Sequence, residues 1–307
     1  MSPKDLTDAL QAALEQRGFK SAMVSSAHVA ELRETIEIQK ASGLIDKGVY
    51  RQYVANFEQM LTQVVSWARS IIVVAMPQPV LEATFAVNGE PRTVVIPPTY
   101  ASSIDATAIM TLEEVLVPNG YKIVRASLPL KLLAVRSGLA RYGKNNISYV
   151  EGMGSFHRLI AFYTDLPVVS DTWRQPQPLD ECEGCNACTK KCPTGAIDPD
   201  QFQLRAGRCL TLHNEAVGPF PEWINQTWHH CLVGCMKCQH FCPVNKDVRS
   251  WTEPFAEFTE SETELLLTGV PKDEMPPSLV AKFRDIDLLE EPTNLARNLR
   301  SVLDSRQ

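Results

Sequence analysis

Apolar residues recur at three- and four-residue spacing in several places along the chain, which predicts helices. The first such stripe follows Ser2, a residue that can cap a helix, and it stops before Gly18. A later stripe is formed by Tyr53, Phe57 and Leu61. The helices predicted in the first 170 residues cover 2–17, 45–68, 103–117 and 129–138.

Short runs of β-branched residues lie between these helices and predict strands. The run "SIIVVAM" is apolar throughout, as is typical of a buried strand. The segment "TFAVNGEPRTVVIPP" predicts a hairpin that turns at Asn88 and Gly89. Because helices alternate with buried strands, the pattern predicts an α/β domain. Apart from the hairpin, the predicted strands cover 70–76, which is the run "SIIVVAM", 121–127 and 157–166.

A stretch rich in proline and polar residues, 168–181, predicts a domain boundary. It separates the α/β region from a cysteine-rich region that ends near residue 248. Helical spacing returns after that region, at 261–268, 278–285 and 293–304. We therefore expect three consecutive domains, which cover 1–174, 175–250 and 251–307.

The charge pattern excludes some classes of partner. The chain has 307 residues and a net charge of −6, with both signs mixed and no basic run of the kind that binds nucleic acid. No apolar run is long enough to cross a membrane. The polar N-terminal segment lacks the apolar core of a signal peptide. From these features we expect a cytoplasmic protein with no nucleic-acid partner and no membrane contact.

All nine cysteines fall between Cys182 and Cys242, which favours metal binding over disulfides in a reducing compartment. The first four follow C-x2-C-x2-C-x3-C-P, the spacing of bacterial ferredoxins for 4Fe–4S clusters. A second motif, C-x2-C-x3-C-P, has the same ending. Zinc is the alternative, but zinc sites usually pair two C-x2-C units and do not explain two C-x3-C-P endings. The pattern predicts two 4Fe–4S clusters.

In two-cluster ferredoxins the fourth cysteine of each motif ligates the other cluster. This rule assigns Cys182, Cys185, Cys188 and Cys242 to the first cluster. The second cluster receives Cys192, Cys235 and Cys238 and needs one further ligand. Spacing alone favours Cys231 for that place, although C-x3-C is not a ferredoxin spacing, and Cys209 is the other candidate.

The chain resembles the epoxyqueuosine reductases and their relatives, the reductive dehalogenases. The resemblance rests on "CEGCNACTKKCPTGAI", "RCLTL", "GCMKCQHFCPVNK" and, more weakly, "SGLARYGKNN". It implies a three-layer α/β domain of the cobalamin-binding type and a ferredoxin-like dicluster domain. With the short helical tail predicted above, the fold expected overall is α+β or α/β. The resemblance also implies a bound cobalamin and favours Cys209, which follows Arg208, as the eighth cluster ligand.

The chain departs from the family pattern in two places. Where the family has a proton-donating aspartate, this sequence has Ala126, which holds no exchangeable proton. About 65 residues follow Cys242, fewer than the helical repeat domain of the tRNA-reading enzymes needs. We therefore expect a substrate other than epoxyqueuosine-tRNA. The absence of a twin-arginine pair also disfavours an exported respiratory dehalogenase.

Replacement catalytic and cofactor-binding residues are expected in the segment that resembles the family's pocket. Tyr142 beside Lys144 is a candidate proton donor with a lowered pKa, and the alternative is a packed tyrosine. Lys144 and Asn145 are the candidate cofactor contacts, with Tyr100 as a further candidate for both roles. The histidines near the cysteines are expected to contact cluster sulfurs or face solvent.

These features predict an iron–sulfur oxidoreductase in which two clusters deliver electrons to a corrinoid that reduces a small organic substrate. The alternative is an electron-transfer protein that reduces a corrinoid or a partner and has no substrate of its own. A plain dicluster ferredoxin would not need so large an α/β domain. Lys190, Lys191 and Lys237 are either ordinary surface residues or a docking patch for an acidic ferredoxin or flavodoxin.

Overall fold

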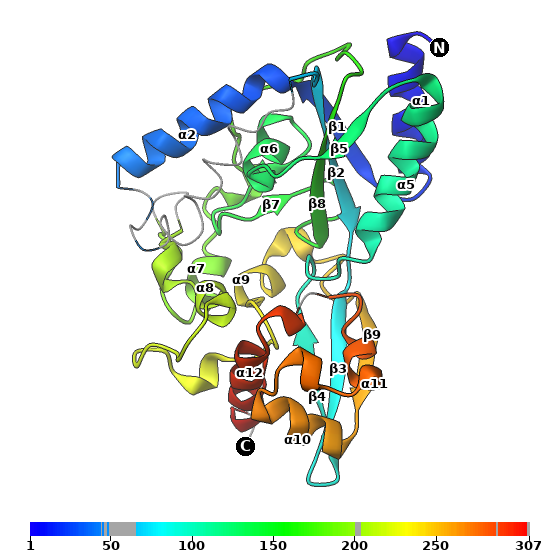
Figure 1. Ribbon diagram of the computed structural model, residues 1–307. Coiled ribbons are helices and arrows are strands. Elements are labelled where there is room, and N and C mark those ends of the chain that lie inside the picture. The colour runs from blue at the N-terminus through cyan, green and yellow to red at the C-terminus, as the bar shows by residue number, and fades with distance from the viewer. Residues whose placement is uncertain (44, 46–47, 49–65, 200–203, 287, 306–307) are drawn as a thin grey trace. The chain divides into compact units, whose positions relative to one another are not determined.

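The computed structural model describes residues 1–43, 45, 48, 66–199, 204–286 and 288–305 (Figure 1). The chain divides into two compact units, and each is assembled from separated segments. The first consists of Met1–Pro77, Ile104–Asn186 and Ile197–Gly207. The second consists of Gln78–Ser103, Ala187–Ala196 and Arg208–Gln307.

The first unit is built on a four-stranded antiparallel sheet with the order β1-β2-β8-β5. Its helices α1 and α5 cover one face, and α2 and α6 cover the other, as Figure 1 shows. The elements are α1 (Pro3–Glu15), β1 (Lys20–Ser25), α2 (Val29–Ala41), β2 (Ser70–Pro77), α5 (Ile104–Leu116), β5 (Ile123–Arg125), α6 (Leu130–Arg136), β6 (Arg141–Tyr142), β7 (Ser148–Tyr149) and β8 (His157–Thr164).

The central strand β2 shows why this sheet is covered on both faces. Successive side chains of a strand point to opposite faces, and nearly every residue of β2 is buried. Ile71 and Val73 pack with α2 and α6, whereas Ile72 and Val74 pack with α1 and α5. The continuous apolar run in the sequence therefore supplies two cores, and the three-layer arrangement expected for this domain is confirmed.

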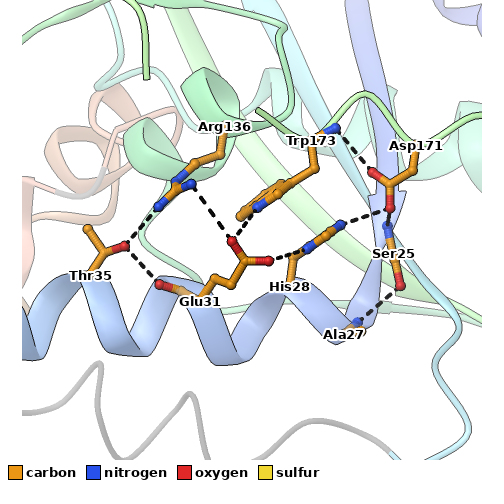
Figure 2. A network of polar contacts seen from close by, with 8 residues as sticks. All are labelled: Ser25, Ala27, His28, Glu31, Thr35, Arg136, Asp171 and Trp173. Carbon is orange, nitrogen blue, oxygen red and sulfur yellow. Dashed lines mark hydrogen bonds and ion pairs between the residues drawn. The ribbon is translucent and has the colours of Figure 1, made fainter. Parts of the chain in front are cut away.

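A network of charged and aromatic side chains attaches the segment after β8 to the start of α2 (Figure 2). The two ring nitrogens of His28 lie 2.8 Å from carboxylate oxygens of Glu31 and Asp171. The His28 ring stacks on Trp173 with 4.3 Å between ring centroids, and the Trp173 indole N–H donates to Glu31. This network holds part of the predicted boundary segment on the first unit.

The second unit contains a three-stranded sheet with the order β4-β3-β9. The hairpin between β3 and β4 turns at Asn88 and Gly89, which both have positive φ, as predicted. Helices α10, α11 and α12 contribute to the core on this sheet. The elements are β3 (Val80–Val87), β4 (Glu90–Ile96), α7 (Ala187–Lys191), α8 (Leu210–Glu215), α9 (Lys237–His240), β9 (Thr252–Phe258), α10 (Glu260–Thr268), α11 (Pro277–Lys282) and α12 (Pro292–Asp304).

The pattern-based predictions hold for most elements, and the misses have physical reasons. The helix predicted over 45–68 lies mostly outside the described residues. The strand predicted over 121–127 is shorter, since β5 covers only Ile123–Arg125. Strand β9 was not predicted because it contains Pro254, which sits where the pairing with β3 shifts register. Strand β1 and helix α2 were also missed.

The three consecutive domains expected from the sequence, 1–174, 175–250 and 251–307, stay a prediction. By compactness the chain divides differently, because β3 pairs in parallel with β9 about 170 residues later. That pairing assigns the hairpin of 80–96 to the second unit. Among the described residues, no helix combines the length and hydrophobicity needed to span a membrane.

We predict an acid-sensitive stability that depends on His157. Burial lowers the pKa of His157 to about 4, and its ring lies between the Gly154 carbonyl and the Ser148 hydroxyl. The unfolded chain binds this proton near pH 6.5, so stability is complete above that pH and falls between about 6.5 and 4, by about 3 kcal/mol. Urea unfolding at several pH values will show a shallower decline for His157→Gln than for wild type.

The exposed His240→Gln is the matched control and should keep the wild-type pH dependence. We expect acid to affect the clusters of wild type, His157→Gln and His240→Gln alike. A difference in pH dependence between the two variants then reports on His157. Equal slopes for His157→Gln and wild type would contradict the prediction.

Candidate iron–sulfur site

Four thiols proposed for the second cluster belong to the second unit. Cys192 follows α7, Cys209 precedes α8, Cys235 precedes α9 and Cys238 lies within α9. All four are partly shielded from solvent. The ligand-bearing segments are short, and each places a thiol at or next to the end of a helical turn.

Backbone N–H groups are directed at these sulfurs. The Ala196 N–H donates to the Cys192 sulfur over 3.4 Å. Burial raises the pKa of the Cys209 thiol, while hydrogen bonds from the Thr211 and Leu212 backbone act in the opposite direction. N–H donors of this kind stabilise sulfur that carries negative charge, which is the form that binds iron. The donor set therefore fits an iron–sulfur cluster.

The thiols also lie close enough to influence one another. The pKa of Cys235 is raised to about 12, mainly by burial and to a smaller extent by the charges of Cys209 and Cys192. Cys192 raises the pKa of Cys209 in the same way. Cys209 therefore lies within electrostatic range of two predicted second-cluster ligands, Cys192 and Cys235.

Cys231 has a different environment. Its side chain is completely buried, and its backbone forms a parallel bridge with Val95 of β4. The following Leu232 N–H donates to the Val95 carbonyl over 2.9 Å. These contacts give Cys231 a role in attaching the cysteine loop to the sheet, and they favour Cys209 as the eighth ligand.

Side chains outside the motifs hold the ligand loops. The Arg208 guanidinium donates to the Thr194 carbonyl over 3.0 Å, which joins the segments of Cys209 and Cys192. His230 accepts from the Met236 N–H over 3.2 Å and so spans the loop that carries Cys235. Both ring nitrogens of His230 thus contact backbone atoms, since the other lies 3.1 Å from the Trp228 carbonyl.

The helix α12 reaches the same loops through buried amides. The Asn298 side chain donates to the carbonyls of Asn214 and Leu232, over 2.9 and 3.1 Å. Asn214 in turn donates to the Gly234 carbonyl over 2.6 Å. Sequence patterns could not reveal this network, because a single asparagine on a helix gives no signal of its partner.

Tyr100, predicted to contact the cofactor, packs against the second-cluster loop. Its hydroxyl donates to the Glu215 carboxylate, and its pKa is raised well above the usual value by burial and by the charges of Glu215, Cys231 and Cys209. A Cβ added at Gly234 would lie 2.6 Å from the Tyr100 hydroxyl oxygen. The tyrosine therefore requires glycine at this place.

Two of the first-cluster thiols, Cys182 and Cys185, belong to the first unit, where Lys144 contacts their loop. The Lys144 N–H points to the Cys182 sulfur over 3.4 Å, and its ammonium donates to the Cys185 carbonyl over 3.0 Å. The other two predicted ligands, Cys188 and Cys242, are buried in the second unit. Lys144 thus supports the cysteine loop, a role that the sequence did not indicate.

Lys144 occupies a tight turn between β6 and β7. The Gly143 N–H donates to the Ile147 carbonyl over 2.9 Å, and Asn146 has a φ of 59°. A Cβ at Gly143 would lie 2.5 Å from the Tyr149 ring. The "GKNN" segment is therefore a compact hairpin turn that presents Lys144 to the cysteine loop.

The structure corrects one property expected of this segment. Burial raises the pKa of Tyr142 to about 12, whereas a lowered pKa was predicted for a tyrosine beside a lysine. The lysine ammonium is directed to Cys185, so it does not assist the phenol. Asn145 is 3% exposed and donates to the Tyr149 hydroxyl. The corrinoid contacts assigned to Lys144 and Asn145 stay predictions, which these contacts do not favour.

Comparison with known proteins agrees with the cluster assignment. Residues 181–245 match the 4Fe–4S double cluster binding domain family, so the prediction of two clusters is confirmed at the level of this domain. The epoxyqueuosine reductase of Lactococcus garvieae is 34% identical over 126 residues, which cover 41% of this chain and 34% of that protein. The Escherichia coli enzyme is 35% identical over 123 residues, 39% of this chain and 31% of its own length.

The fold gives a broader match. The epoxyqueuosine reductase structure from Bacillus subtilis superposes with a TM-score of 0.71 at 20% identity, covering 99% of this chain and 82% of that one. The chain is similar in sequence to part of these epoxyqueuosine reductases and shares their fold. The sequence match spans about a third of the length of these relatives. A catabolic reductive dehalogenase gives a TM-score of 0.38, a likeness that carries no argument here.

We predict that Gly234→Ala removes the second cluster. The added methyl would collide with Tyr100 inside the ligand loop, and the φ of +65° disfavours any side chain. Iron analysis of the reconstituted protein should fall from about eight to about four irons per chain. Gly195→Ala is a matched control, because Gly195 has a φ of +63° and lies near Cys192 but faces open space. It should keep both clusters.

Serine substitutions should separate the two candidate eighth ligands. Cys209→Ser is expected to lose the second cluster, since Cys209 lies with Cys192 and Cys235, and Cys231→Ser is expected to retain it. Iron content and the EPR signal of the reduced protein provide the measurement. Retention of about eight irons in Cys209→Ser would reverse the assignment.

Proposed function

We propose that this chain is a 4Fe–4S reductase in which two clusters relay electrons from a protein donor to a corrinoid, with a small organic molecule as the final substrate. One observation carries the proposal: residues 181–245 match a 4Fe–4S double cluster domain, in a chain with the epoxyqueuosine reductase fold whose Ala196 N–H is directed at the Cys192 sulfur. A ferredoxin or a flavodoxin is the expected donor, and a reducing cytoplasm suits nine free cysteines.

The second cluster is assigned Cys192, Cys209, Cys235 and Cys238, and the first is assigned Cys182, Cys185, Cys188 and Cys242. Shielding and N–H donors are among the features that set cluster potentials. The residues around the cysteines thereby influence the reduction potentials of the two clusters. Lys144 orients the Cys182 loop. No proton is needed for this electron relay.

A corrinoid, when bound, supplies reductive chemistry at cobalt. The resemblance assigned Lys144, Asn145 and Tyr100 to its binding, but each of these side chains already contacts protein. The corrinoid part of the proposal therefore rests on the resemblance alone. The alternative, an electron-transfer protein with no substrate of its own, needs only the clusters and a partner.

Two substrate classes are in competition. Ala126 favours a substrate other than the modified tRNA: it is 5% exposed within the core, its N–H pairs with the Ala161 carbonyl, and it has no proton to donate. The relatives favour tRNA, since one epoxyqueuosine reductase of the same fold was solved with an epoxyqueuosine-modified tRNA stem loop. The proton for a small substrate would come from another group, and Tyr142, with its pKa near 12, would act as a weak acid.

Binding and turnover experiments decide between these proposals. The reconstituted protein is mixed with cob(II)alamin, and we expect co-elution and a changed cobalt EPR spectrum. An unchanged spectrum without co-elution would leave the electron-transfer alternative. Reduction of an epoxyqueuosine-modified tRNA stem loop by the cobalamin-loaded protein would overturn the small-substrate proposal.

We predict that Tyr142→Phe leaves cluster content unchanged and slows substrate turnover if the phenol donates the proton. The reason is that the substitution removes a hydroxyl and retains the buried ring. Single-turnover cobalt reduction should stay at the wild-type rate. Equal turnover in Tyr142→Phe and wild type would assign the proton to another group.

A further inference from the structure

The second unit carries an exposed aromatic side chain beside the cysteine motifs. Phe241 is 42% exposed, although large apolar side chains are usually buried. It directly precedes Cys242, a proposed first-cluster ligand. The ring of His240 packs edge-on against Phe241, with 5.1 Å between centroids. The ring is therefore held in place at the surface next to a ligand.

Positive charge surrounds this ring. The Lys191 ammonium lies 4.5 Å from the centre of the Phe241 ring, and Lys191 directly precedes Cys192, a proposed second-cluster ligand. Lys190 is exposed next to it. Lys237 begins α9 one turn before the ring, and the Phe241 N–H donates to the Lys237 carbonyl over 3.4 Å. The helices α7 and α9, which carry these lysines, lie in contact.

The charge of this surface is opposite to that of the whole chain. The net charge of the chain is −6, yet the two cysteine motifs hold three lysines on the contacting helices α7 and α9, and one of them lies over the Phe241 ring. A protein of net negative charge repels acidic partners except where a positive surface faces them. We call Lys190, Lys191, Lys237 and Phe241 the lysine–phenylalanine surface.

We propose that the lysine–phenylalanine surface is the docking site of a small acidic electron-carrier protein. Carboxylates of the carrier would pair with the lysines, and an apolar rim around its redox centre would cover Phe241. One electron then leaves the reduced carrier and enters an oxidised 4Fe–4S cluster, with no bond made or broken and no proton transferred. The inference rests on the proposed function, since it requires the clusters.

The surface explains how the carrier comes close to the clusters. Lys191 and Phe241 each adjoin a cysteine assigned to a different cluster, because Cys192 and Cys242 are the ligands that cross between motifs. A carrier that binds Lys191 and Phe241 would contact residues directly next to Cys192 and Cys242, one proposed ligand of each cluster. The small contact expected of such a surface suits a transient electron-transfer complex.

The test measures reduction of the reconstituted protein by a purified, reduced, acidic 2Fe–2S ferredoxin in stopped-flow experiments at low and high salt. The wild-type rate constant should fall about tenfold or more from low to high salt, as steered association does. Lys190→Glu/Lys191→Glu should lose about tenfold at low salt and show little further salt dependence. Phe241→Ala should slow the reaction at both salt concentrations.

Lys4→Glu/Lys20→Glu is the matched control, since it reverses two exposed charges on the first unit. It should react with the ferredoxin at about the wild-type rate and keep the wild-type salt dependence. A salt-independent wild-type rate would overturn the proposal without any variant. So would equal rates for the two double variants.

Dithionite separates the docking surface from the clusters themselves. Lys190→Glu/Lys191→Glu should lose far more of its ferredoxin rate than of its dithionite rate, and an equal loss with both reductants would overturn docking. Failure of dithionite to reduce the wild-type protein would instead count against the proposed two-cluster function.

Discussion

Burial of sulfur that must carry negative charge is the constraint on which the rest of this structure depends. A thiolate in a shielded place is costly unless N–H groups or cations lie near it. The protein meets this cost locally, through the N–H groups at Cys192 and Cys209 and the Lys144 contact at Cys182. Bound iron would supply the remaining positive charge, so the cysteine loops and the clusters stabilise each other.

The supporting residues come from distant parts of the sequence. Tyr100 from the segment after β4 packs on Gly234, and α12 contributes Asn298 to the carbonyls of the cysteine loop. The parallel pairing of β3 and β9 brings these segments into one unit. The C-terminal helices are thus part of the iron–sulfur site, and their removal would expose the loop that carries Cys235 and Cys238.

The position of Lys144 connects the cysteine loop to the α/β unit. Its backbone and side chain both reach the Cys182–Asn186 loop, from a turn that is held by Gly143 and Asn145. A residue assigned to a cofactor pocket by resemblance is thereby a structural support of the first cluster loop. The lysine–phenylalanine surface lies on the second unit, so electron entry and the support of the Cys182 loop use different lysines.

The sequence by itself determined the double cluster domain and most of the helices and strands with strong periodicity, and it predicts that ligands cross between the motifs. These depend on local spacing, since two or three residues between cysteines set the loop around a cubane, and an apolar run such as "SIIVVAM" is buried in any arrangement. The tertiary structure showed that Cys231 is buried against β4, and it reversed the expected pKa shift of Tyr142. Both depend on what surrounds a side chain in space, and burial and long-range partners leave no local pattern in the sequence.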